Sequence, residues 1–197
     1  MNKIRWFAHK ALGSNKLLDI KNSCTTNAYG IELDVQLYNN KLVLNHDLIR
    51  DNFNKKYPLL SDALKIIKDT DKMILLDIKG IDKKENVASE LKKELEKIQI
   101  NKNKILISSF NESYLSEINH ILPEQKLGYI TCNVPCINFN FVPHFISFIS
   151  LDYNIINQSI VNMIKNCNKD VFIWTIKNDK KINLKNIDYI ISDIKLN

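Results

Sequence analysis

Two acidic side chains lie two positions apart in a run that is otherwise mostly apolar. The run is GIELDVQLY, residues 30–38, and the acids are Glu32 and Asp34. Alternate residues of a β-strand point to the same face, so the two carboxylates would project side by side. Like charges resist burial unless a cation lies among them. The spacing therefore indicates a divalent metal site.

A third carboxylate, Asp77, lies in the run LLDIK at residues 75–79, and Lys79 follows it at strand spacing. Carboxylate oxygens are hard ligands that favour Mg²⁺ or Ca²⁺ over zinc. We therefore expect Glu32, Asp34 and Asp77 to hold one divalent cation, Mg²⁺ or Ca²⁺. Lys79 would share the face of Asp77 and present a positive charge to an anion.

Two histidines, His9 and His46, stand at the ends of predicted strands. A single histidine at a strand end is more often structural than catalytic. Two of them from separate strands, beside a metal site, suit a general acid and a general base near neutral pH. A cation, two histidines and a lysine around one pocket fit the cleavage of a phosphodiester.

Strand-like and helix-like runs alternate along the chain and would position these side chains. The predicted strands are residues 3–9, 29–38, 41–46, 72–80, 104–110, 126–131, 145–150, 171–176 and 188–193. The predicted helices are residues 14–28, 60–70, 83–100, 111–122 and 154–167. Ser61 or Asp62 is expected to cap the second helix and Asn111 the fourth. Asn39 and Asn40 are expected to form a hairpin-like turn.

The strands that a helix or crossover separates number about eight, which is the number that closes a (β/α)8 barrel. The chain has 197 residues, fewer than the roughly 250 typical of that fold. We expect a compact α/β TIM barrel in a single domain over residues 1–197, with shortened crossovers and no C-terminal helix. A doubly wound open sheet is the alternative, but no Gly-rich turn follows a strand to bind a dinucleotide.

Five segments resemble the glycerophosphodiester phosphodiesterase family of PLC-like phosphodiesterases, in that family's order. They are AHK at 8–10, GIELDVQLYNNKLVLNHD at 30–47, LLDIK at 75–79, VFIWTI at 171–176 and DYIISD at 188–193. The resemblance implies a metal-dependent TIM-barrel hydrolase that cleaves glycerophosphodiesters to an alcohol and glycerol phosphate. It also implies the roles of six residues: His9 and His46 as acid and base, Glu32, Asp34 and Asp77 as metal ligands, and Lys79 as a phosphate contact.

The chain departs from that family at three positions in or directly after these segments. The family usually follows its first histidine with Arg-Gly, whereas this chain has Lys10 and Ala11, and Asp77 stands where Glu is usual. Lys10 keeps the charge for substrate binding without the bidentate grip of Arg on phosphate. The sphingomyelinase D-like phospholipases D look similar around Asp77. The alternatives are therefore a phospholipase D-like enzyme acting on lysophospholipid or sphingomyelin, and a non-catalytic barrel that binds a phosphorylated ligand.

Two apolar features have two interpretations each. Trp174 is a candidate substrate-binding residue that would stack on a choline or lipid headgroup, and core packing is the other interpretation. Residues 139–148 could give peripheral contact with a membrane, and a barrel strand with its loop explains them equally well.

The formal net charge of +6 is spread along the chain rather than clustered. We therefore expect a solvated lysine-rich surface and no specific nucleic-acid partner. The expected partner is a small phosphodiester or lysophospholipid substrate. No run reaches the roughly 18 apolar residues of a membrane span, and residues 1–10 show no signal-peptide pattern, so a cytoplasmic location is expected. The sequence does not indicate an oligomeric state.

Overall fold

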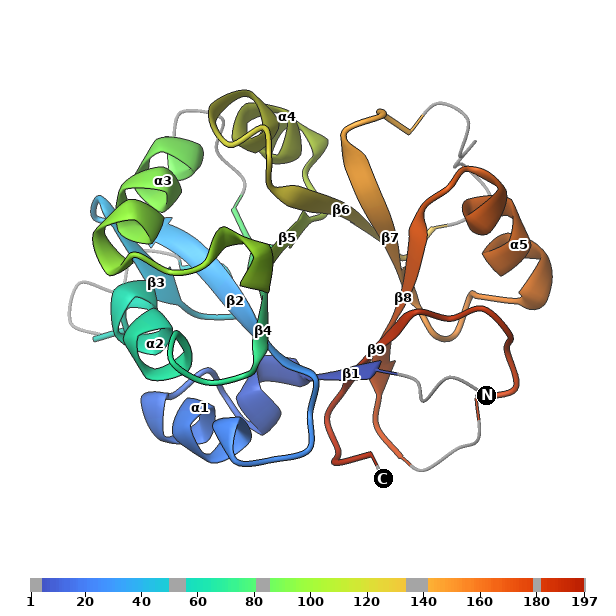
Figure 1. Ribbon diagram of the computed structural model, residues 1–197, viewed down its shortest axis with the longest axis horizontal. Coiled ribbons are helices and arrows are strands. Elements are labelled where there is room, and N and C mark those ends of the chain that lie inside the picture. The colour runs from blue at the N-terminus through green and yellow to red at the C-terminus, as the bar shows by residue number, and fades with distance from the viewer. Residues whose placement is uncertain (1–4, 50–55, 81–85, 134–141, 179–181, 197) are drawn as a thin grey trace.

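Parallel strands close into a barrel in the computed structural model, which describes residues 5–49, 56–80, 86–133, 142–178 and 182–196. The strand order is β1-β9-β8-β7-β6-β5-β4-β2-β3, and the pairing of β1 with β2 closes the ring. Every pairing is parallel except that of β3 with β2. The predicted (β/α)8 barrel is confirmed, and Figure 1 looks along it.

The strands are β1 (Arg5–Ala8), β2 (Gly30–Tyr38), β3 (Lys41–Leu44), β4 (Met73–Ile78), β5 (Ile105–Ser109), β6 (Lys126–Thr131), β7 (Ile146–Asp152), β8 (Asp170–Ile176) and β9 (Tyr189–Ser192). The helices are α1 (Leu17–Cys24), α2 (Leu60–Ile67), α3 (Val87–Ile98), α4 (Glu112–Ile121) and α5 (Gln158–Asn166). Two short 3₁₀ turns are η1 (His9–Leu12) and η2 (Lys102–Lys104).

The helices cover the barrel unevenly. In Figure 1, α1 to α4 line one side in succession and α5 lies on the other. Within the described residues no helix lies between β6 and β7, between β8 and β9, or after β9. This part of the chain therefore agrees with the predicted short crossovers and missing C-terminal helix. Of residues 139–148, the first three lie outside the described residues and the last three begin β7.

Of the two predicted helix caps, one is confirmed and one is wrong. The side chain of Asn111 accepts a hydrogen bond from the backbone N–H of Ser113, which confirms the predicted cap of α4. The predicted cap of α2 by Ser61 or Asp62 is wrong. The N-cap residue is Leu59, two residues before Ser61, and no side chain caps this helix. Asp62 lies in the first helical turn instead, where a negative charge still suits the helix dipole.

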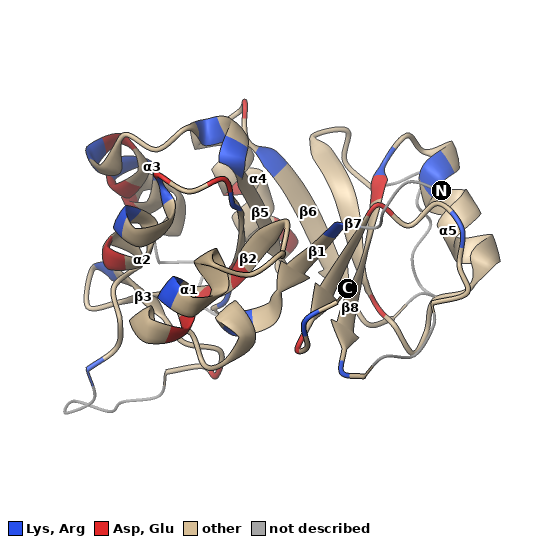
Figure 2. Cartoon of the chain, turned by 60° about the horizontal axis from the view of Figure 1, so that its bottom comes forward, with Lys and Arg blue, Asp and Glu red and all other residues tan. Residues whose placement is uncertain are grey.

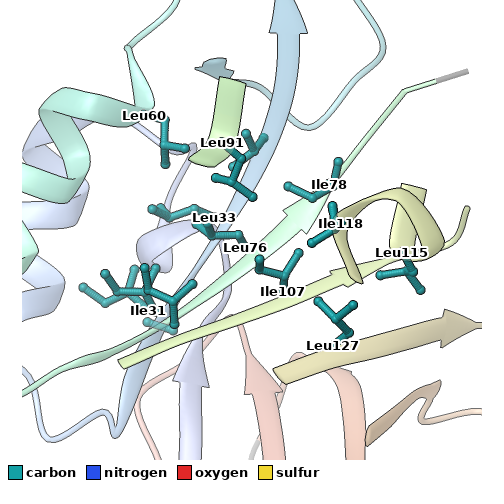
Figure 3. Close-up of a cluster of buried hydrophobic side chains, with 14 of the residues drawn as sticks. Ile31, Leu33, Leu60, Leu76, Ile78, Leu91, Ile107, Leu115, Ile118 and Leu127 are labelled. Atoms are coloured by element: carbon teal, nitrogen blue, oxygen red, sulfur yellow. The ribbon is translucent and has the colours of Figure 1, made fainter. Parts of the chain in front are cut away.

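A large apolar core lies between the outer face of the barrel and the helices. Figure 3 shows Ile31, Leu33, Leu76, Ile78 and Ile107 from the strands packed among side chains from the helices. The helix side chains labelled there are Leu60, Leu91, Leu115 and Ile118. On β2 and β4 the residues between these apolar ones point the other way, into the barrel.

A second apolar cluster fills the barrel interior. It consists of Phe7, Leu75, Leu106, Phe148, Phe172 and Ile191. Two glycines make room for the rings, each from the strand next to the ring concerned. A Cβ at Gly128 would lie 1.9 Å from the Phe148 ring, and one at Gly30 would lie 2.3 Å from the Phe7 ring. The next inward-facing position along most of these strands, on the carboxyl side, is therefore where a cavity can open.

Long polar side chains join neighbouring strands at the opposite, amino-terminal rim. Lys72, Lys104, Gln125 and Lys169 each stand directly before a strand and donate to backbone carbonyls at or before the start of a neighbouring strand. Lys72, for example, donates to Thr26 and Ala28 at 2.9 Å each. Such bonds satisfy carbonyls that a buried rim would otherwise leave unpaired.

Lysine and arginine side chains are distributed over several helices, often beside acidic ones, in the view of Figure 2. No helix among the described residues is long and apolar enough to cross a membrane.

The substitution Gly128→Ala should destabilise the barrel by about 1–3 kcal/mol, because the added methyl group would overlap the Phe148 ring. Chemical denaturation would measure the free energy of unfolding. The double variant Gly128→Ala/Phe148→Leu should recover part of the loss relative to Phe148→Leu alone. Equal stability of Gly128→Ala and the wild type would contradict this packing.

Candidate active site

A cavity of about 660 Å³ opens at the carboxyl ends of the strands. The eight residues that the sequence marks as site candidates all line it: His9, Lys10, Glu32, Asp34, His46, Asp77, Lys79 and Trp174. The structure thus brings together side chains from β2, β4 and β8 and from the segments that follow β1, β3 and β4. Their roles remain predictions.

The three carboxylates meet because β2 and β4 are parallel and in register. Asp34 pairs with Asp77, and Glu32 pairs with Leu75, one inward position below Asp77. Each carboxylate offers an oxygen, and these oxygens all lie within 4.8 Å of one another. The residues are only 3%, 1% and 7% exposed for Glu32, Asp34 and Asp77. Three acids this close and this buried form a strongly anionic pocket.

The chain that follows β1 supports two of these carboxylates. Lys10, Ala11 and Leu12 all have positive φ, and this left-handed turn directs the backbone N–H of Lys10 to Glu32 Oε2 at 2.8 Å. Asn15, itself at φ 60°, is buried and donates from Nδ2 to Asp34 Oδ2 at 2.9 Å. Asn tolerates this conformation better than most residues. Asn15 is absent from the set of residues that the sequence pattern marks.

Lys79 pairs with two of the carboxylates rather than projecting freely into the cavity. Its Nζ lies 2.5 Å from Asp77 Oδ2 and 3.2 Å from Asp34 Oδ1. These two charges raise the pKa of Lys79 although burial opposes the shift. Lys79 is therefore a fixed positive charge beside the acids.

The raised pKa values of two of the acids indicate that the charge of one lysine does not offset the negative charge of three carboxylates. Burial, then the charges of Asp34 and Asp77, raise the pKa of Glu32 well above its usual value. Burial also raises the pKa of Asp77 to about 6, although Lys79 opposes it. The Oδ1 atom of Asp77 is buried and has no hydrogen-bond partner among the described residues.

The three carboxylates fit a divalent cation. An orphaned buried oxygen and raised acid pKa values both indicate positive charge that the described side chains do not supply. The donor set contains only oxygen, which is the chemistry that Mg²⁺ and Ca²⁺ prefer. Glu32, Asp34 and Asp77 are the residues that would hold the ion.

His9 is oriented by a carboxylate on the neighbouring strand. Because Ala8 on β1 pairs with Ser192 on β9, the next residues, His9 and Asp193, come side by side. His9 Nδ1 lies 2.5 Å from Asp193 Oδ1, which leaves Nε2 as the nitrogen that can act on a ligand. Burial lowers the pKa of His9, and the contact with Asp193 only partly offsets it. A neutral His9 near pH 7 can accept a proton.

His46 lies across the site in a more open position, in the segment that follows β3. Its side chain is 48% exposed, and its Nδ1 lies 2.9 Å from Asp47 Oδ1. The two histidines therefore differ in their surroundings, because the side chain of His9 is 17% exposed and that of His46 is 48% exposed.

Gln36 anchors the segment that carries His46. It is buried on β2 and shares the inward face with Asp34. Its Nε2 donates to the carbonyls of Asn45 and Asp47 at 2.7 and 2.8 Å. Its Oε1 accepts from the N–H of Ile49 at 3.1 Å. A single strand thus holds two carboxylates and the anchor of a histidine, an arrangement that the sequence pattern does not mark.

Aromatic side chains form part of the wall beside Lys79. Trp174 and Phe110 meet edge to face, with ring centroids 5.8 Å apart. Lys79 Nζ lies 5.6 Å from the centre of the Phe110 ring. Phe110 is 44% exposed and lines the cavity, although its place at the end of an apolar strand gives no sign of this.

Comparison with known proteins identifies the fold. No family model and no curated protein matches the sequence. Among solved structures, a phosphodiesterase from Oleispira antarctica in complex with the product sn-glycerol-3-phosphate is similar at 18% identity and a TM-score of 0.86, over 97% of this chain and 93% of that one. A glycerophosphodiester phosphodiesterase from Parabacteroides distasonis is similar at 18% identity and a TM-score of 0.78, over 98% and 93%.

A calcium-dependent phosphoinositol-specific phospholipase C from a Pseudomonas species is also similar, at 9% identity and a TM-score of 0.66, over 96% of this chain and 88% of that one. At these identities the comparisons show that the chain shares the TIM-barrel fold of phosphodiesterases.

The Asp77→Asn variant should become progressively more stable than the wild type as the pH rises from about 4 to about 6, in the presence of a chelator. The folded protein keeps the Asp77 proton up to about pH 6, whereas the unfolded chain releases it near 3.8. The raised pKa therefore lowers wild-type stability as Asp77 ionises, by about 3 kcal/mol in full. Denaturant unfolding of both proteins across this range would measure the difference, and a constant difference would contradict it.

The Gln36→Leu variant should loosen the segment that carries His46, because Leu keeps the volume and removes all three anchoring hydrogen bonds. Amide hydrogen exchange should become faster at Ile49 and its neighbours than in β2 and β4. Gln125→Leu, which removes a buried glutamine at the opposite rim, is the matched control. Unchanged protection at Ile49 would show that other contacts hold the segment.

Proposed function

We propose that this chain is a divalent-cation-dependent phosphodiesterase that hydrolyses glycerophosphodiesters to an alcohol and glycerol phosphate. The observation that carries the proposal is the meeting of three buried carboxylates with two histidines in one cavity. The similar solved structures support it, since two of them are named as phosphodiesterases or glycerophosphodiester phosphodiesterases. Family membership and enzymatic activity are both part of this proposal.

The anionic wall of the cavity would bind the reacting phosphate through a cation. A bound Mg²⁺ or Ca²⁺ would neutralise the phosphate and stabilise the charge that develops on its oxygens. Glu32, Asp34 and Asp77 would hold that ion, and Lys79, already within the cluster, would add a fixed positive charge. Lys10 lines the same cavity and is the proposed second cationic contact for the substrate.

His9 is the proposed general base. Its lowered pKa keeps Nε2 unprotonated near neutral pH, and Asp193 holds the ring and would stabilise the imidazolium that forms. His9 would take the proton from the attacking oxygen, which belongs to water or to a hydroxyl group of the substrate. As the new P–O bond forms, the bond to the leaving alcohol breaks.

His46 is the proposed general acid. It would give its proton to the leaving oxygen, so that the alcohol departs neutral and the two histidines together move one proton through the reaction. Its half-open position would let it regain a proton from solvent between turnovers. Trp174, with Phe110 against its ring, is proposed to contact the organic part of the substrate.

A non-catalytic phosphate-binding barrel is the second candidate. The observation in its favour is the pairing of Lys79 with Asp34 and Asp77, which partly neutralises the acids without an ion. A phospholipase D-like activity on lysophospholipid or sphingomyelin is the remaining alternative for the substrate.

Turnover of glycerophosphocholine, glycerophosphoethanolamine, lysophosphatidylcholine and sphingomyelin by the full chain tests these candidates, with Mg²⁺, with Ca²⁺ and with a chelator. We expect cation-dependent turnover of the first two. His9→Ala and His46→Ala should each lower kcat by about 10²–10⁴-fold, the usual contribution of a general acid or base. His120→Ala, on the exposed surface of α4, is the matched control and should keep full activity.

A substrate with p-nitrophenol as leaving group separates the two histidines, because that group departs without a proton. His46→Ala should lose much less activity on it than His9→Ala. Turnover that persists in chelator would exclude the cation, and a folded protein that binds the cation and turns over none of the four compounds would favour the binding role.

A further inference from the structure

Two polar groups on the far wall of the cavity have no hydrogen-bond partner in the described part of the chain. Ser150 on β7 and Trp174 on β8 both line the cavity, and Ser150 is only 1% exposed. The Oγ atom of Ser150 and the Nε1 atom of Trp174 are buried, and neither has a hydrogen-bond partner among the residues that the structure describes. The mechanism proposed above uses neither of these atoms.

The topology places both groups across the barrel from the acids. In the closed eight-stranded ring, β7 is four strands from β2 in either direction, and β8 is four strands from β4. Ser150 and Trp174 thus face the carboxylates of Glu32, Asp34 and Asp77 across the cavity. A phosphate bound at the acids would direct the rest of its molecule toward them.

The register brings the two groups to one place on that wall. Ser150 pairs with Phe172, and Trp174 is the next residue of β8 on the same side as Phe172. Ser150 and Trp174 are therefore diagonal neighbours on the inward face. Ile130, which pairs with Ser150 on the neighbouring strand, and Ile191 also line the cavity.

The chemistry of the two groups selects a hydroxyl group. An indole N–H can only donate, whereas a serine hydroxyl both donates and accepts. A single hydroxyl group of a ligand can accept from Trp174 and donate to Ser150, which satisfies both protein atoms at once. A buried donor that stays unpaired is unfavourable, so a ligand that supplies this hydroxyl gains affinity over one that lacks it.

We propose that Ser150 and Trp174 form a hydroxyl-binding subsite, which selects phosphodiesters whose phosphate carries a polyol with a free hydroxyl group. The inference rests on one part of the proposed function, the binding of the phosphate at the acids through a cation. A cavity of about 660 Å³ is of a size that holds such a molecule. Ser150 and Trp174 are specificity residues in this scheme and take no part in proton transfer.

Binding of two small phosphates tests the subsite without requiring turnover. Glycerol 3-phosphate and propyl phosphate share a three-carbon chain and a phosphate, and only the first has hydroxyl groups. With Mg²⁺ or Ca²⁺ present, calorimetry should show about tenfold tighter binding of glycerol 3-phosphate to the wild type. Ser150→Ala and Trp174→Phe should each lose most of this preference and bind propyl phosphate as the wild type does.

Two matched variants control for indirect effects. Ser147→Ala removes a hydroxyl from the same strand at a residue that is not among those lining the cavity. Trp6→Phe removes an indole N–H that is also buried and has no partner among the described residues, but that lies within the core between barrel and helices. Both should keep the tenfold preference.

Each outcome decides between the subsite and the function on which it rests. Equal binding of both phosphates by the wild type, or an equal loss for both in Ser150→Ala, would overturn the subsite and leave the phosphodiesterase proposal standing. Preference for glycerol 3-phosphate in a protein without turnover would keep the subsite and overturn the enzyme. Binding of neither phosphate would overturn both.

Discussion

The burial of three carboxylates on two neighbouring strands is the constraint on which the site depends. Glu32 and Asp34 on β2 and Asp77 on β4 are held in register by backbone pairing, so their charges cannot move apart. Burial raises the pKa of Glu32 and Asp77, which shows that the folded chain meets an electrostatic cost there. A nearby lysine, a backbone N–H and an asparagine reduce that cost, and one oxygen of Asp77, without a hydrogen-bond partner among the described residues, remains for a cation.

The two-residue period of a strand explains how distant parts of the chain reach one cavity. On strand after strand, the inward residue beyond the apolar cluster is a cavity residue: His9 follows Phe7, Asp77 follows Leu75, Ser150 follows Phe148 and Trp174 follows Phe172. The second apolar cluster closes the bottom of the cavity, and the glycines on β2 and β6 let its phenylalanine rings approach the barrel wall. The packing of these rings therefore determines how far along the barrel axis the polar side chains of the cavity lie.

Much of the fold and the charged part of the site could be predicted because the signal is local. Acids two apart in an apolar strand indicate a shared face, whichever strand lies next to it. Asn15 and Gln36 carry no such signal. Asn15 falls in a segment with helical character, and its bond to Asp34 exists only because a left-handed turn precedes α1. Gln36 looks like an ordinary polar strand residue until the segment after β3 folds back over it.

The two walls of the cavity are built differently, and in the proposed scheme one wall carries out the reaction while the other selects the ligand. The wall from β2 and β4 contains the three buried carboxylates and ends in Lys79, and these groups are so close that changing one alters the protonation of its neighbours. The wall from β7 and β8 contributes groups that contact few polar partners. A substitution at Ser150 can therefore change which ligand fits without disturbing the acids across the barrel. In the proposed scheme, substitutions on the wall from β7 and β8 therefore alter the choice of ligand, whereas substitutions among the acids alter the reaction.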